Sequence, residues 1–370
     1  MINLYVLTGA FLVAVVLGRI IIPNILIISL RKKLFDQPDA RKVHNRPIPR
    51  LGGVTFFPVI VFTFAVFTAF RVMGNNIPNE LFTTDTACEF LFLIAGLTLL
   101  YIVGIGDDLV GVRYRKKFLV QIISASLFPI GGLYINDFYG LFGINAISPF
   151  IGIPLTVLLV VFITNAINLI DGIDGLASGL SMVALVIFGV LFIHYNLWNY
   201  AILAFVCVGV IIPFFAYNVF GNADKGRKIF MGDTGSLTLG YILSFFVIRY
   251  CMHAPGYNLE EYGAPVVVSF SMLLVPCLDV IRVVLKRART GKPLFLPDKN
   301  HIHHKFLAMG FSPRGALITI QIMSGFFCTF SFLAVRYMNN TLVFVIDIVV
   351  WTLLNIWFNK IIIKREQGSK

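Results

Sequence analysis

Charged residues are scarce in this sequence. Lys, Arg, Asp and Glu together make up 13% of its 370 residues, whereas a soluble globular protein carries about 25%. Polar stretches are also short, because the longest of them, 286–314, has the length of a loop and not of a domain. This lack of charge excludes a soluble globular fold, and the 58% share of hydrophobic residues predicts a protein that lies mostly in the lipid bilayer.

Paired cysteines are missing, and the first apolar segment lacks the features of a signal peptide. The five cysteines have no regular spacing, so the sequence predicts neither a disulfide framework nor a zinc site. No basic residue precedes the first apolar segment, and no small-residue cleavage site follows it. We therefore expect this segment to remain in the protein as a membrane span.

Long apolar segments dominate the sequence instead. About eleven of them, each of roughly 18–25 residues, have the length that a helix needs to cross a bilayer. The sequence therefore predicts an all-α polytopic integral membrane protein in which residues 1–370 form one domain. The predicted spans are 3–30, 52–72, 89–106, 118–135, 151–170, 176–195, 199–219, 235–251, 264–285, 315–336 and 342–363.

Basic residues are distributed unevenly between the predicted loops. Most of the 30 Lys and Arg residues lie in loops 31–50, 107–117, 220–234 and 286–314 or in the tail from Lys360, whereas the alternate loops have none. The positive-inside rule then places the N-terminus outside and the C-terminus in the cytoplasm. Since topology and an anionic substrate explain the net charge of +12, we expect no nucleic-acid partner.

Four groups of polar residues lie at predicted span ends on the cytoplasmic side. A carboxylate costs roughly 2.5–3.5 kcal/mol at a span centre, so a chain that gathers several of them beside lipid is expected to use them. We predict one composite active site in loops 31–50, 107–117, 171–175, 220–234 and 286–314. The four groups are 106–108, 165–175, 231–236 and 301–304.

The first two groups have the pattern of a metal or phosphate site. Asp107 and Asp108 are adjacent and cannot face the same way on a helix, so one could bind a metal while the other meets a substrate. Alternatively, they form a solvated acidic turn. Asn168, Asp171 and Asp174 are spaced i, i+3 and i+6 and would share one helix face, although a helix cap followed by a polar turn explains part of this pattern.

The other two groups are less specific. Asp233 opens the predicted eighth span, either as a helix N-cap or as a metal ligand beside amides that attract phosphate. The histidines in 301–304 lie in a basic loop, where they could donate to phosphate or uracil oxygens, bind zinc or simply be solvated. Asp279, in the predicted ninth span, is expected to pair with Arg282 three residues later.

Together these motifs resemble one family of membrane enzymes. From 46–53 (RPIPRLGG) to 300–304 (NHIHH), their order, spacing and topology are similar to those of the polyprenyl-phosphate N-acetylhexosamine-1-phosphate transferases. Loop 298–304 is similar to the undecaprenyl-phosphate GlcNAc-1-phosphate transferase branch and differs from the related phospho-MurNAc-pentapeptide translocases. The resemblance implies transfer of a sugar-1-phosphate from a UDP-sugar to a polyprenyl phosphate, with release of UMP.

The resemblance also implies roles for individual residues. It places a Mg²⁺ or Mn²⁺ ion on Asn168 and Asp233, and it makes Asp107, Asp108 and Asp171 the expected catalytic residues. Within this set, Asp107 would engage the lipid phosphate. Uracil would lie between Phe230 and Asp174. The diphosphate would meet Lys117 and the histidines of 301–304. The expected substrate-binding residues are Lys117, Asp174, Asn218, Phe230, His301, His303 and His304.

The expected partners are a UDP-N-acetylhexosamine, undecaprenyl phosphate and membrane lipid. The resemblance implies a bacterial cytoplasmic membrane with the site facing the cytoplasm, and a homodimer is compatible with the sequence. UDP-GlcNAc is the expected donor, and the alternatives are another UDP-HexNAc or UDP-MurNAc-pentapeptide. A secondary transporter is the alternative from another class, but transporters bind their substrates near the midplane between repeats, whereas these motifs gather at one membrane face.

Overall fold

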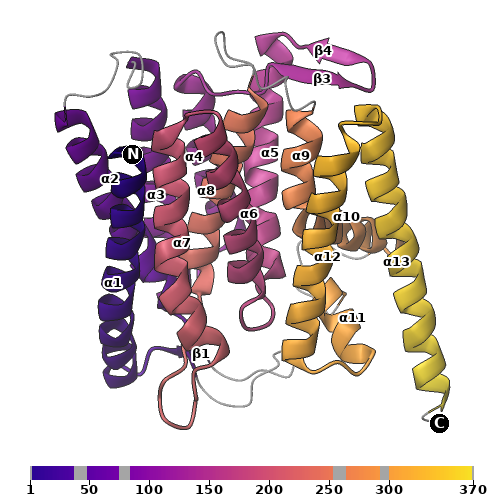
Figure 1. The fold of residues 1–370 in the computed structure, drawn as a ribbon. Coiled ribbons are helices and arrows are strands. Elements are labelled where there is room, and N and C mark those ends of the chain that lie inside the picture. Colours follow the sequence, from indigo (N-terminus) through magenta and orange to yellow (C-terminus); the bar gives the residue numbers. More distant parts are fainter. Residues whose placement is uncertain (1, 37–47, 75–83, 253–263, 292–299, 369–370) are drawn as a thin grey trace.

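The computed structural model describes residues 2–36, 48–74, 84–252, 264–291 and 300–368 (Figure 1). Segments 37–47 and 292–299, which belong to two of the predicted active-site loops, lie outside the described residues. With them go the first two residues of the 46–53 motif and the first two of loop 298–304.

The described chain is built almost entirely of helices. Two short antiparallel pairs of strands interrupt them: β1 (Phe35–Asp36) pairs with β2 (Ile48–Pro49), and β3 (Asp137–Leu141) pairs with β4 (Ile144–Ala146). A short 3₁₀ helix, η1 (Gly52–Thr55), precedes α2. The α-helices are α1 (Ile2–Arg31), α2 (Phe56–Met73), α3 (Thr84–Val110), α4 (Tyr114–Ile130), α5 (Pro149–Ile170), α6 (Leu176–His194), α7 (Trp198–Val219), α8 (Gly232–Cys251), α9 (Pro265–Met272), α10 (Leu274–Arg289), α11 (Ile302–Ala308), α12 (Pro313–Ala334) and α13 (Asn340–Gly368).

The prediction of a helical, polytopic membrane protein is confirmed. Among the described residues, nine helices are long and apolar enough to cross a membrane, or ten if the bent pair α9 and α10 forms one span. The remaining predicted span, 118–135, corresponds to α4, which is a helix of 17 residues with three basic residues in its first turn. The count of eleven spans therefore stays a prediction. The two termini lie at opposite ends of the bundle (Figure 1), as the predicted topology requires.

The segment 264–285, predicted as one apolar span, is bent in the structure. The helix breaks after Met272, and α9 and α10 meet at an angle of 76°. Pro276, in the first turn of α10, has no amide hydrogen and its ring conflicts with the carbonyl four residues earlier, which is that of Met272. Beyond the break, α10 carries buried apolar residues on one side and ends in basic residues, so the chain turns away from the direction of α9.

Helix α8 lies at the centre of the bundle. Its entire membrane-spanning stretch is buried, and it packs against α3 and α5. Small residues make these contacts close: a Cβ added at Gly104 of α3 would meet Thr234 at 2.6 Å, and one added at Gly240 of α8 would meet Thr164 at 2.7 Å. These crossings bring the ends of three helices together where the predicted motifs lie.

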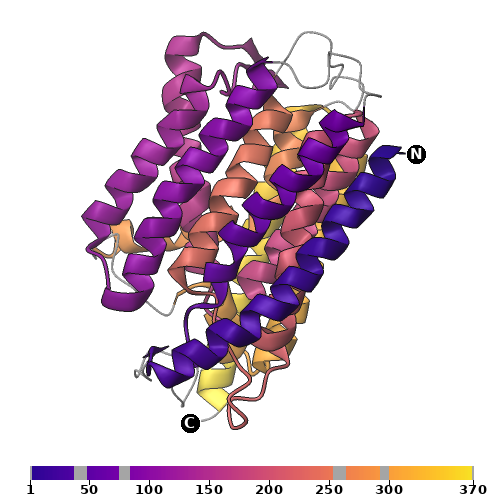
Figure 2. The ribbon, with the colours of Figure 1, turned by 90° about the vertical axis from the view of Figure 1, so that its left-hand side faces the viewer.

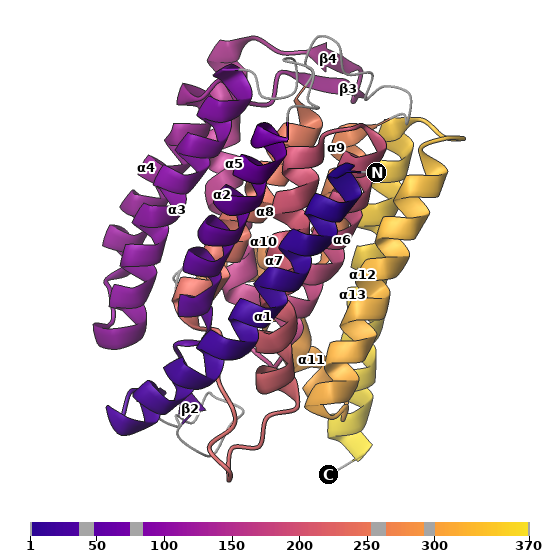
Figure 3. The same cartoon turned by 60° about the vertical axis from the view of Figure 1, so that its left-hand side comes forward.

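Other helices surround this centre. Helix α1 lies along the outside of the bundle against α7 (Figure 2). Helices α3 and α4 form one edge, and α12 and α13 form the opposite edge (Figure 3). The β3–β4 hairpin, which connects α4 to α5, lies at the end of the bundle away from the C-terminus (Figure 1).

Candidate active site

Asp108 caps the first turn of helix α8. The backbone amides of Asp233 and Thr234 donate to its two carboxylate oxygens at 2.8 and 2.9 Å, and the Thr234 hydroxyl donates to Oδ2 at 2.6 Å. The first amides of a helix have no partner within the helix, and a carboxylate is favoured there by hydrogen bonding and by the helix dipole. Asp108 therefore uses both oxygens to fix the start of α8, and with it Asp233.

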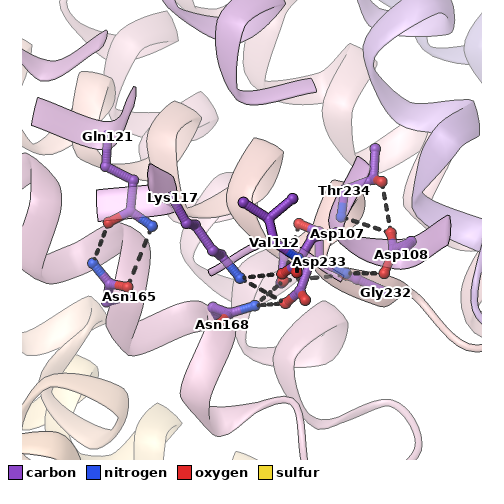
Figure 4. Close-up of polar contacts among 11 residues, drawn as sticks. Asp107, Asp108, Val112, Lys117, Gln121, Asn165, Asn168, Gly232, Asp233 and Thr234 are labelled. Carbon is purple, nitrogen blue, oxygen red and sulfur yellow. Dashed lines mark hydrogen bonds and ion pairs between the residues drawn. The ribbon is translucent and has the colours of Figure 1, made fainter. Parts of the chain in front are cut away.

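Lys117 lies between two carboxylates at this point. Its Nζ is 3.0 Å from Oδ2 of Asp107 and 3.1 Å from Oδ1 of Asp233 (Figure 4). The amide nitrogen of Asn168 donates to the same Asp233 oxygen. It also donates to the Ser236 hydroxyl, at 2.8 Å. Helices α3, α4, α5 and α8 thus each contribute to one polar network, as the sequence predicted for a composite site.

Both carboxylate oxygens of Asp107 have partners. Its Oδ1 accepts a hydrogen bond of 2.6 Å from the amide of Val112, in the turn after α3, while Oδ2 pairs with Lys117. The three charged side chains are not sealed off, because Asp107, Lys117 and Asp233 keep 14%, 12% and 19% of their side-chain surface exposed. A ligand can therefore reach the side of Asp107 that faces Lys117.

A pair of amides holds α4 and α5 together one turn deeper. The amide nitrogen of Asn165 donates to Gln121 Oε1 at 2.6 Å, and Gln121 Nε2 donates back at 3.3 Å (Figure 4). Gln121 lies four residues after Lys117 and Asn165 lies three residues before Asn168. The pair therefore keeps Lys117 and Asn168 facing each other. Sequence motifs do not point to Gln121, because its partner on another helix cannot be read from spacing.

Asp171 and Asp174 do not share a helix face with Asn168, so that prediction is wrong. Helix α5 ends at Ile170 and Asp171 is its C-cap. The chain then turns through Gly175, which has φ +78°, a conformation that glycine adopts without steric cost. This is the alternative in which a cap and a polar turn follow the helix. The turn still keeps Asp171 close enough to Asp233 and Asp108 for their charges to interact.

The turn at 171–175 is fixed by Asn218. Its Oδ1 accepts a hydrogen bond from the Gly175 amide at 2.6 Å, and its Nδ2 donates to the Ile229 carbonyl at 2.9 Å. Asn218 is buried and uses both ends of its amide, so these contacts favour a positioning role over the predicted contact with substrate. Asp174, by contrast, is half-exposed and accepts from Lys228 Nζ at 2.6 Å.

Phe230 is held by the 46–53 motif. Its amide donates to the Pro49 carbonyl at 2.8 Å, and its carbonyl accepts from the Gly52 amide at 2.9 Å. Gly53 allows this segment to pack directly on α8, because a Cβ there would meet Gly235 at 2.2 Å. The motif therefore fixes the backbone of Phe230 three residues before Asp233, where α8 begins.

Arg50 belongs to the site, although the sequence prediction did not include it. Burial raises the pKa of Asp171 to about 7, and the nearby carboxylates of Asp233, Asp174 and Asp108 act in the same direction, whereas the charge of Arg50 opposes them. Asp171 is thus poised to exchange a proton near neutral pH. The signal for Arg50 was its place within the RPIPRLGG motif.

Asp279 holds the histidine segment in place. It is fully buried and pairs with Arg282 at 2.6 Å, which confirms the predicted ion pair. It also lies 2.8 Å from His301 Nδ1 and accepts a hydrogen bond of 3.0 Å from the amide of Ile302. Asp279 therefore fixes both a predicted substrate-binding histidine and the first turn of α11, a role that sequence spacing could not reveal.

His303 packs on the 171–175 turn. A Cβ added at Gly172 would come within 2.1 Å of His303 Nε2, and the ring lies parallel to that of His301 and 4.2 Å from that of His304. Burial, reinforced by the charge of His304, lowers the pKa of His303 to about 3. Among the described residues, the buried Nδ1 of His303 has no hydrogen-bond partner, so the neutral imidazole keeps one polar atom unused.

The predicted metal ligands fit a hard divalent cation. Asn168 and Asp233 are in contact, and only the amide nitrogen of Asn168 is used in the hydrogen bonds that it makes within the described chain. Its oxygen is therefore available, and Asp107 lies just across Lys117. Within the described ranges, no three His, Cys, Asp or Glu side chains form a metal cluster. Magnesium, however, commonly uses one or two carboxylates and completes its shell with water and substrate phosphate.

Comparison with known proteins identifies the family. A profile of glycosyl transferase family 4 matches residues 90–251. The chain is 33% identical to a protein of Bacillus subtilis named probable undecaprenyl-phosphate N-acetylglucosaminyl 1-phosphate transferase, over 86% of this chain and 82% of that protein. It is 29% identical to the undecaprenyl-phosphate alpha-N-acetylglucosaminyl 1-phosphate transferase of Yersinia pestis, over 80% and 75% of the two chains. It is also 33% identical to a decaprenyl-phosphate N-acetylglucosaminephosphotransferase of Mycobacterium tuberculosis, over 78% and 72%.

Proposed function

This chain belongs to glycosyl transferase family 4 and is a sugar-1-phosphate transferase of the polyprenyl-phosphate type, and from this premise we propose its substrates. We propose that it transfers GlcNAc-1-phosphate from UDP-GlcNAc to undecaprenyl phosphate. The products are undecaprenyl-diphosphate-GlcNAc and UMP, and the reaction is the first membrane step in the synthesis of an envelope polysaccharide. The names of the relatives support GlcNAc as the sugar and undecaprenyl phosphate as the acceptor.

The network around Lys117 carries this proposal. Phosphoryl transfer needs positioning and neutralisation of the phosphate oxygens more than covalent help from the protein. Lys117 brings one positive charge, and Asn168 and Asp233 would hold a magnesium ion, which when bound supplies further positive charge to the phosphates. These groups come from three different helices, so a diphosphate bound among them would be oriented from several sides.

Asp107 is assigned to the acceptor. A phosphate monoester has a second pKa near 6, so the polyprenyl phosphate is already largely ionised at neutral pH and needs orientation more than deprotonation. The side of Asp107 that pairs with Lys117 is partly exposed, and we assign the meeting point of the two reacting phosphates to it. Asp171, whose pKa burial raises to about 7, is the residue best suited to exchange a proton in this region.

The uridine is assigned to the side of the site formed by Asp174 and Phe230. Asp174 offers a half-exposed carboxylate that pairs with Lys228, and Phe230 offers a ring on a segment whose backbone is fixed. His301, His303 and His304 are assigned to the diphosphate. We place this whole end of the bundle at the cytoplasmic face of a bacterial inner membrane, where UDP-sugars are available.

A panel of UDP-sugars with purified protein and undecaprenyl phosphate tests the proposal. We expect UMP release with UDP-GlcNAc in the presence of Mg²⁺, and none after EDTA treatment. Release with another UDP-HexNAc or with UDP-MurNAc-pentapeptide, and not with UDP-GlcNAc, would correct the donor while leaving the reaction intact. UMP release by detergent-solubilised protein also separates the enzyme from the transporter alternative, because a transporter would release none.

A further inference from the structure

The C-terminal helix α13 is bonded to the helix that carries the histidines. Lys305 of α11 is buried, and its Nζ lies 2.9 Å from Oδ1 of Asn355 on α13. Asn355 is also buried, and its amide nitrogen donates to the Trp351 carbonyl at 3.0 Å. This second bond fixes the orientation of the amide, so that its oxygen is presented to Lys305. A buried ammonium that loses its partner is costly, so this contact opposes any separation of α11 from α13.

Apolar and cationic contacts continue along the same face of α13. Phe306 of α11 packs against Phe358, with ring centroids 5.1 Å apart and both rings almost fully buried. Farther along, the guanidinium of Arg365 covers Gly310, where an added Cβ would meet Nη1 at 1.6 Å. The residues on α13 are spaced so that they face α11 together. Contact thus runs from the middle of α11 into the turn that follows it.

The other end of α13 is bonded to the β3–β4 hairpin. Asn340 Nδ2 donates to the Tyr139 carbonyl at 2.7 Å, and the amide of Phe142 donates to the Thr341 hydroxyl at 2.7 Å. The Phe142 ring also packs edge-on against Phe344. Figure 1 shows α13 running from this hairpin to α11. Since the hairpin connects α4 to α5, the helix is attached at one end to the segments that carry Lys117 and Asn168, and at the other end to the histidines.

Helix α11 needs such support to keep its position. It has only 7 residues, whereas isolated helices shorter than about 12–15 residues are marginal in water. Asp279 holds its first turn through Ile302 and His301, but His303 makes no hydrogen bond through Nδ1 within the described residues. The place of the His303 ring against Gly172 therefore depends on where the whole helix lies.

We propose that α13 is a positioning element of the active site, which uses Asn355 and Phe358 to set α11 so that His303 meets the 171–175 turn. The part of this inference that concerns substrate rests on the proposed function, because it takes His303 to contact the diphosphate of the UDP-sugar. The part that concerns the position of His303 does not depend on any activity. The two parts can therefore be tested separately.

The first test measures the exposure of His303 directly. Diethyl pyrocarbonate modifies accessible neutral imidazoles, and His303 is buried whereas His194 is exposed, so modification of His194 serves as the internal reference. We expect slow modification of His303 in the wild type and at least about tenfold faster modification in Asn355→Ala. Asn355→Asp, which can still accept from Lys305, should restore the slow rate. Mass spectrometry of the modified peptides gives both rates in one sample.

Two further variants guard against a trivial result. Thr352→Val lies on the same helix, with an exposed side chain bonded only to its own helix, and should leave His303 as slow as in the wild type. Lys305→Met removes the same bond without leaving an unpaired ammonium in the interior, so it carries the test if Asn355→Ala fails to fold. Asn355→Ala and Lys305→Met both delete the bond, and an unchanged rate of His303 modification in whichever of them folds would overturn the proposal. An equally accelerated rate in Thr352→Val would overturn it as well.

The second test uses the reaction. We expect Lys305→Met and Asn355→Ala to raise the KM for the UDP-sugar about tenfold, equivalent to ~1.4 kcal/mol, with a smaller change in kcat, and Asn355→Asp to recover most of the loss. A purely structural role would lower the amount of active enzyme and leave KM unchanged. If no UDP-sugar is turned over by the wild type, the proposed function fails, and the modification experiment still decides the role of α13.

Discussion

Asp108 provides the sharpest test of how this site is built. The sequence places it beside Asp107 as a second catalytic carboxylate, whereas its three contacts in the structure are with the first turn of α8. In Asp108→Asn, one side-chain oxygen can still accept hydrogen bonds. The other oxygen is replaced by an NH₂ group, which faces a backbone N–H that needs an acceptor. One of the three bonds is therefore lost and the charge at the helix N-terminus disappears.

The size of the effect follows from these contacts. A hydrogen bond to a charged group contributes about 1.5–3 kcal/mol, and a charge at a helix N-terminus contributes about 0.3–1 kcal/mol more. We therefore expect Asp108→Asn to lower the stability of the folded protein by roughly 2–4 kcal/mol and its thermal unfolding midpoint by at least a few degrees. Transfer activity should fall as well, because the start of α8 sets the position of Asp233.

Asp107→Asn is the matched control. This change keeps an oxygen for the Val112 amide and alters the side that pairs with Lys117, where the groups are partly exposed. We expect kcat to fall with little change in the unfolding midpoint. Intrinsic tryptophan fluorescence during heating in detergent, followed by UMP release from the same preparations, measures both quantities. If Asp108→Asn keeps the wild-type midpoint and still loses kcat, Asp108 acts on the substrate and the capping argument is wrong.

Five more outcomes are expected. Asp233→Ala should lose at least ~10²-fold in kcat, because it removes a charge that acts in the transition state, and in the wild type EDTA should abolish UMP release until Mg²⁺ or Mn²⁺ is restored. Phe230→Ala should mainly raise the KM for the UDP-sugar, and an unchanged KM would remove it from the uridine site. Burial lowers the pKa of His303 to about 3, so below the unfolded value near 6.5 only the unfolded chain gains a proton at this residue. The stability of the folded protein therefore decreases as the pH is lowered, by at most about 1.4 kcal/mol per pH unit. Between pH 6.5 and 5 the unfolding midpoint should decrease less steeply in His303→Gln than in the wild type. In a cysteine-free background, Lys225→Cys should react with an impermeant thiol reagent only after the membrane is opened, and Asn145→Cys should react in intact cells; the reverse would overturn the predicted orientation.

Hydropathy was sufficient to predict the class of this fold. The predicted spans correspond to helices along the whole chain, because a bilayer imposes length and apolarity on every segment that crosses it. The break between α9 and α10 was missed because average hydropathy does not register a single residue. Pro276 was the available signal, since proline near the middle of an apolar run interrupts the helical hydrogen bonds.

The residues of the site were easier to find than their roles. Asp107, Lys117, Asn168 and Asp233 were selected from motifs, and the structure joins them in one network. The positioning contacts were invisible in the sequence because each one links separate helices. Asn355 is the clearest case: it looks like an isolated polar residue in an ordinary span, and only the fold shows that its partner is Lys305.

The charge balance of the network explains why metal and substrate should be linked. Lys117 pairs at present with both Asp107 and Asp233, so it cannot neutralise a diphosphate without leaving two carboxylates close together and uncompensated. A divalent cation on Asp233 and Asn168 would compensate those carboxylates and leave the ammonium free to bind phosphate. The same carboxylates that make the site costly beside lipid would then be neutralised by the cation that we propose for the reaction. Lys117 would take the place of this cation only in the resting enzyme. This competition for one ammonium is the physical reason to expect that EDTA removes activity by disabling Lys117 as well as by removing the metal.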